Sequence, residues 1–60
     1  MNLDEIYDYV SDECKGLSMV SEVGIIDLVG KRGLRMLKEH NLLEDRGIIH
    51  GRQMYVLLKK

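Results

Sequence analysis

A single cysteine constrains this chain most, because its 60 residues have to fold without an internal disulfide bond. A domain of this size hides only about 60% of its unfolded surface. Small domains therefore tend to need a disulfide, a metal ion, a partner chain or very efficient packing. Cys14, His40 and His50 lack the closely spaced pairs that structural zinc sites use. The remaining sources of stability are efficient packing and oligomerisation. We expect no cofactor.

The apolar residues are too scattered along the chain to form a membrane span. No apolar run approaches the roughly 20 residues that a spanning helix needs. The N-terminus is acidic, whereas a signal peptide begins with positive charge. A lone thiol also suits a reducing compartment. We therefore expect a cytoplasmic protein without a membrane partner.

The net charge of −1 hides a strong division between the two halves of the chain. Residues 1–30 hold seven acids against one base, a net charge of −6, whereas residues 31–60 hold eight bases against three acids, a net charge of +5. Such asymmetry suggests that one side of the molecule faces a polyanion such as nucleic acid.

Three helical segments are predicted. The first covers about residues 2–15, because Asn2 is a good N-cap and Glu5 completes the pattern of a capping box. A short second helix is predicted at about residues 18–23. The third is predicted at about residues 27–40 from its apolar spacing.

Two glycines complicate the third helix. Gly30 and Gly33 each lower helix propensity by roughly 1 kcal/mol relative to alanine, so a start near Gly30 is an alternative. With the apolar positions turned inward, Lys31, Arg32 and Arg35 fall together on the outward arc. The sequence therefore predicts a helix with one basic face.

A β-hairpin is predicted over about residues 42–58, with a tight turn at His50 and Gly51. A second turn at residues 45–47 competes with it, so the register stays open. Partial alternation predicts two faces: Met54, Val56 and Leu58 inward, and Gln53, Tyr55 and Leu57 outward.

The predicted fold is a single α+β domain over residues 1–60, with three helices followed by a two-stranded hairpin. From about Ser18 to Leu58 it resembles the winged helix-turn-helix family. The stretches "SMVSEVGIIDLVGKRGLRMLKEHNLL" and "GRQMYVLL" carry the resemblance. The second is similar to the wing of ArsR- and MarR-like regulators, which often reads Gly-Arg-x-x-Tyr-x-Leu.

The chain departs from that family in three respects. The third helix carries two glycines, the second helix is short and lacks the usual alanine, and Asn41 stands where many members have glycine. No metal-sensing set of cysteines and histidines is present. The resemblance therefore implies a DNA-binding fold without metal sensing or an evident small-molecule effector.

The resemblance implies that the third helix reads the major groove of double-stranded DNA. Arginine can donate two hydrogen bonds to guanine there, which is the role expected of Arg32 or Arg35. Lys31 is expected to contact a phosphate, and Leu28 a thymine methyl group. Lys38 is included in the same interface.

The hairpin is expected to act as a wing. Arg52 is predicted to enter the minor groove or to contact the flanking backbone, and His50 to assist when it is protonated. The candidate DNA-binding residues are therefore Leu28, Lys31, Arg32, Arg35, Lys38, His50 and Arg52.

These residues predict a sequence-specific transcription regulator, more specifically a repressor. We expect it to act as a homodimer that uses its first helix and part of its last strand. The alternatives are a basic helix face that is simply solvated and a winged protein-interaction module without DNA affinity. An enzyme is not expected, because no nucleophile with a base and no carboxylate pair is apparent.

Overall fold

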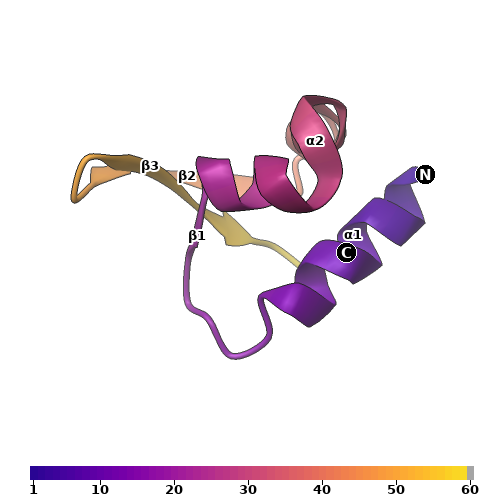
Figure 1. Cartoon of the computed structure of the whole chain (residues 1–60), viewed down its shortest axis with the longest axis horizontal. Coiled ribbons are helices and arrows are strands. Elements are labelled where there is room, and N and C mark those ends of the chain that lie inside the picture. The colour runs from indigo at the N-terminus through magenta and orange to yellow at the C-terminus, as the bar shows by residue number, and fades with distance from the viewer. Residues whose placement is uncertain (60) are drawn as a thin grey trace.

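The computed structural model describes residues 1–59, which form two α-helices and a three-stranded antiparallel sheet (Figure 1). The chain runs through α1 (Leu3–Glu13), β1 (Val20–Ser21), α2 (Glu22–Glu39), β2 (Leu43–Ile49) and β3 (Arg52–Leu57). The strands lie in the order β1-β3-β2, so β3 is central and is covered by α2.

The predicted arrangement of three helices followed by a two-stranded hairpin is wrong. Residues 18–21 are not helical, and β1 adds a third strand by pairing Val20 with Tyr55. The helix begins later because Ser21 is its N-cap and accepts a hydrogen bond from the Gly24 N–H at 3.0 Å. The helical residues after Ser21 form one element, α2.

α2 is kinked at Gly30, which has φ +76° and ψ 172°. Residues 22–29 and residues 31–39 are helical on either side, and Figure 1 shows that they run in different directions. Only glycine adopts this conformation readily. The expected helix at residues 27–40 is therefore divided by its own glycine.

α1 begins as its sequence predicts. The Asn2 side chain accepts a hydrogen bond from the Glu5 N–H at 2.9 Å, and the Glu5 carboxylate accepts one from the Asn2 N–H at 3.3 Å. The helix buries Ile6 and Val10 against α2. Gly33 is needed within α2 itself, since a Cβ there would lie 2.5 Å from Val29 Cγ2, whereas it would make only an ordinary contact of 3.6 Å with Ile6 Cγ2.

The core includes Tyr55, which corrects the predicted facing of the last strand. Tyr55 is only 3% exposed, whereas Met54 and Val56, which were expected to face inward, are half-buried. The alternation of apolar and polar residues along residues 52–58 is too weak to determine which face of the strand points inward. The buried hydrophobic residues within residues 1–59 are Ile6, Val10, Val20, Ile25, Leu34, Leu37, Leu42 and Tyr55.

β2 and β3 are joined by His50 and Gly51, which have φ +53° and +77°. Two successive positive φ values are typical of the tight turns that fit the twist of a hairpin. The competing turn near Gly47 is instead an irregularity in β2, where the register with β3 shifts between Asp45 and Ile48. Asp45 stabilises it, because its carboxylate accepts hydrogen bonds from the Gly47 N–H at 2.7 Å and from the Gln53 amide.

These hydrogen bonds predict a pH response in the hairpin. They hold the pKa of Asp45 below its ordinary value of 3.8, with the Gly47 N–H as the main cause and Gln53 second. The stability that this carboxylate contributes is therefore present above pH 3.8 and is lost as the pH falls through the lower folded pKa. In an NMR titration, the Gly47 amide shift should have its midpoint below 3.8, and Asp45→Asn should abolish the transition. A midpoint at or above 3.8 would contradict this arrangement.

Candidate nucleic-acid interface

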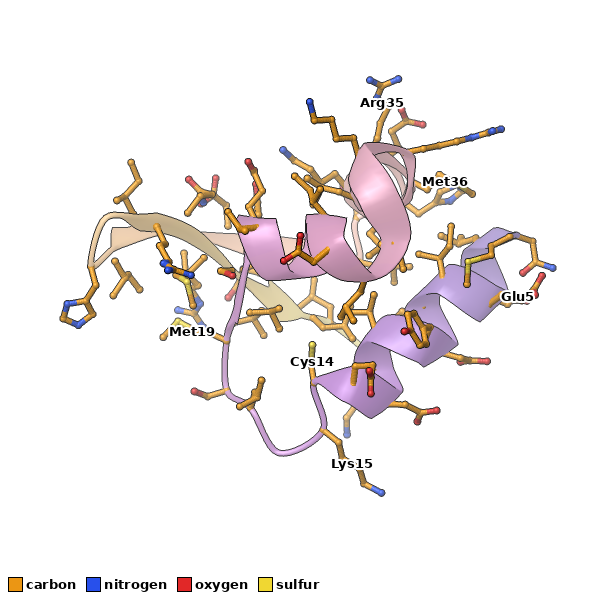
Figure 2. All side chains as sticks on the ribbon, in the orientation of Figure 1. Glu5, Cys14, Lys15, Met19, Arg35 and Met36 are labelled. Carbon is orange, nitrogen blue, oxygen red and sulfur yellow. The ribbon has the colours of Figure 1, made fainter. Side chains whose placement is uncertain are left out.

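The second part of α2 carries four exposed cations: Lys31, Arg32, Arg35 and Lys38. Lys31, Arg35 and Lys38 have the spacing i, i+4 and i+7, which places them on one face of a helix. Figure 2 shows Arg35 projecting away from the body of the molecule. We call the depression beside these three side chains the basic groove. It has a volume of about 410 Å³ and is also lined by Glu22, Ile26, Leu34 and Glu39.

Arg32 lies outside the basic groove. It is one residue after Lys31 and is therefore turned by about 100° around the helix. It lines a smaller hollow with Val29, Gly33 and Met36 of α2 and with Met1 and Ile6. Arg32 is thus exposed on the side of α2 that faces the start of α1.

Leu28 and Arg52 lie together in a different depression, which we call the apolar groove. It has a volume of about 550 Å³. Glu22 and Ile26 line the basic groove, whereas Gly24 and Leu28 line the apolar groove. At about 100° per residue, these two pairs point in roughly opposite directions from residues 22–29. The apolar groove is lined by Glu13, Cys14, Leu17, Met19, Val20, Ser21, Gly24, Asp27, Leu28, Arg52 and Met54.

His50 is exposed in the turn at the tip of the hairpin, which extends away from the helices (Figure 1). The structure therefore gathers Lys31, Arg35 and Lys38 in one groove. It does not bring Arg32, Leu28, Arg52 or His50 to that groove.

Tyr55 and Glu22 contribute to this site but were not among the candidate DNA-binding residues. The Tyr55 hydroxyl donates a hydrogen bond to Glu22 Oε2 at 3.0 Å, and Lys38 Nζ lies 5.5 Å from the centroid of the Tyr55 ring. Glu22 belongs to the first part of α2 and Lys38 to the second. One buried ring on β3 therefore contacts both parts of α2 across the kink and fixes one wall of the basic groove.

The exposed ammonium group of Lys38 interacts with other groups of the protein. The pKa of Lys38 is raised by the Tyr55 side chain, through hydrogen bonding first and charge second, and then by Glu22 and Asp45. In contrast, no ion pair reaches Lys31, Arg32 or Arg35 within residues 1–59, where the one pair found joins Arg46 Nε to Glu44 Oε2 at 2.8 Å. These three cations are free to meet an external anion.

Removing the Tyr55 hydroxyl should loosen this contact. We expect Tyr55→Phe to destabilise the fold by ~0.5–1.5 kcal/mol, which is typical of one lost hydrogen bond. The pKa of Lys38 should also fall toward its ordinary value of 10.5, as measured by NMR titration of the lysine side chain. Tyr9→Phe is the control, because Tyr9 is 42% exposed. An unchanged pKa of Lys38 in Tyr55→Phe would contradict the hydrogen bond between Lys38 and the Tyr55 hydroxyl.

No family model matches the chain, and neither the curated proteins nor the solved structures contain a match. Within residues 1–59, no helix is both long and apolar enough to cross a membrane. The same residues contain no group of three or more histidine, cysteine or acidic side chains that could hold a metal ion.

Proposed function

We propose that this chain is a sequence-specific double-stranded DNA-binding regulator that docks through the second part of α2. The observation that carries the proposal is the set of three exposed cations, Lys31, Arg32 and Arg35, without an ion pair within residues 1–59. The phosphate groups of a duplex supply the negative charges with which these side chains can pair.

The dimensions of the helix support this docking. The helix of residues 31–39, with its side chains, is about 10–12 Å across. The major groove of B-DNA is about 12 Å wide and admits one α-helix. Arg35, in the middle of the segment, is suited to a guanine edge. Lys31, at its start, is suited to a phosphate.

The position of the cations also favours a functional role. Lys31 and Arg32 lie in the first turn after the kink, at the positive end of the helix dipole. Positive charge is unfavourable there for the helix itself. Local choices that oppose stability tend to mark functional sites. A bound phosphate would reverse the effect, because helix N-termini favour anions.

The resemblance to the winged helix-turn-helix family adds a second contact to the proposal. In the proposed complex, the hairpin lies beside the docked helix, and the exposed His50 reaches the flanking DNA backbone. Arg52, which lines the apolar groove, is left out of the DNA contact. We further propose that the protein is a cytoplasmic repressor that acts as a homodimer.

A protein-interaction module is the second candidate, and the apolar groove favours it. Half-exposed apolar surface beside α2 would suit a protein partner whether or not DNA binds. The two candidates differ in their response to salt, because only binding to a polyanion weakens steeply as the salt concentration rises.

Selection of binding sites from random duplexes by the purified protein tests the proposal. A DNA-binding regulator should enrich one motif, and its affinity for that motif should fall between about 50 and 200 mM salt. Enrichment of no motif, together with salt-independent or undetectable binding, would leave the interaction module as the better account.

A further inference from the structure

The apolar groove carries hydrophobic side chains that the rest of the chain leaves uncovered. Leu17 at its edge is 63% exposed, and Met19, Leu28 and Met54 are only half-buried. These side chains come from the loop after α1, from α2 and from β3. A small domain with one cysteine gains stability when a second chain covers such a surface.

The apolar groove carries charges of both signs. Two exposed acids, Glu13 of α1 and Asp27 of α2, and one exposed base, Arg52 of β3, line it. No ion pair joins them within residues 1–59. A two-fold axis makes the same patch meet itself, so a patch with both signs can pair Arg52 of each copy with Asp27 of the other.

The sequence favoured the first helix for dimerisation, but the outer face of this helix does not carry charges of both signs. Its outer face exposes Glu5, Asp8 and Asp12, and no basic residue lies within Leu3–Glu13. Two copies that met through this face would bring like charges together. Self-association is therefore better served by the apolar groove.

We propose that the apolar groove is the surface through which two copies of this chain pair about a two-fold axis. Leu17 of each copy enters the groove of the other, and Arg52 pairs with Asp27 across the axis. Because the apolar groove and the basic groove point in opposite directions from residues 22–29, pairing leaves both basic grooves uncovered. The proposal concerns the protein alone and holds whether or not the chain binds DNA.

The area that the interface can bury sets the expected strength of the dimer. Stable interfaces take about 800 Å² from each partner, which is about a fifth of the 4300 Å² surface of this chain. Val23, 56% exposed and four residues before Asp27, lies near enough to extend the contact. We expect a reversible dimer that dissociates on dilution.

Sedimentation equilibrium of the full chain without DNA, from low micromolar to millimolar concentration, tests the pairing. The protein should change from monomer to dimer across this range, and Leu17→Glu should weaken the dimer by about tenfold or more. Ile48→Glu is the matched control, because Ile48 is 74% exposed on β2 and does not line the groove. A monomer at every concentration, or equal dimerisation of wild type and Leu17→Glu, would overturn the proposal.

A charge exchange tests the symmetry. Arg52→Glu and Asp27→Arg should each weaken the dimer, whereas the double variant should restore it, because the pair is then reversed but intact. Failure of the double variant to recover, while its circular dichroism shows a folded chain, would also overturn the proposal. Both residues are exposed, so each variant should fold.

Discussion

Replacing Lys31 and Arg35 together by alanine is expected to remove most of the specific affinity for duplex DNA. Loss of the Lys31 phosphate contact should lower the slope of log affinity against log salt by about one. Loss of Arg35 should cost ~1–3 kcal/mol and relax the choice of one base pair. Fluorescence anisotropy with the selected duplex, at several salt concentrations, measures both effects.

Lys15→Ala is the matched control for the single variant Lys31→Ala. Lys15 is also an exposed lysine, but it follows α1 and lies at the opposite end of the molecule from Arg35 (Figure 2). Its removal changes the net charge by the same amount as the removal of Lys31 and should leave the affinity almost unchanged. Equal losses in Lys15→Ala and Lys31→Ala would mean that binding depends on total charge and not on the second part of α2.

Gly30→Ala is expected to cause the largest loss of stability among the glycine-to-alanine changes at positions with free space. A Cβ at Gly30 would meet no atom within 4 Å, so the cost arises from the backbone and not from a clash. An L-residue held at φ +76° and ψ 172° costs ~1–3 kcal/mol. A domain of this length has a total stability of only about 3–9 kcal/mol. Urea unfolding should show this loss directly.

A D-alanine at position 30 distinguishes the cost of the backbone conformation from the effect of adding a methyl group. D-residues favour the mirror-image backbone angles, for which the φ and ψ of Gly30 are ordinary. A synthetic chain with D-alanine should therefore be at least as stable as wild type, whereas the L-alanine chain is destabilised. If the two alanine forms are equally stable, the kink does not depend on the positive φ of Gly30.

The sequence predicts the start of α1 and the tight turn at His50 and Gly51 because the signals there are local. Asn2 and Glu5 form a cap within one turn, so their types alone specify it. The kink is a different case. Glycines in a helical pattern indicate only weakened helix propensity, and the positive φ of Gly30 depends on how both parts of α2 pack on the core.

β1 could not be predicted from the sequence, because it too depends on long-range packing. Two residues carry no periodicity, and Val20 becomes a strand residue only because Tyr55 lies opposite it. The inward turn of Tyr55 likewise depends on Glu22, which is 33 residues away along the chain. Long-range pairs of this kind leave no pattern in a short segment.

The candidate site was partly accessible to sequence reasoning. Helical spacing alone places Lys31 and Arg35 on one face, and the structure has them in one groove. The kink and the strand register decide the rest, since they turn Leu28 and Arg52 into the apolar groove. Charge counting along the chain cannot distinguish these two surfaces.

NMR mapping of the free and duplex-bound protein is the most direct test of the DNA-binding surface. The proposal predicts that the largest shift changes occur at the amides of residues 31–35 and at the side-chain Nε groups of Arg32 and Arg35. The outer face of α1 and the lining of the apolar groove should change little. Changes confined to α1 or to the apolar groove, or no change at saturating duplex concentration, would contradict it.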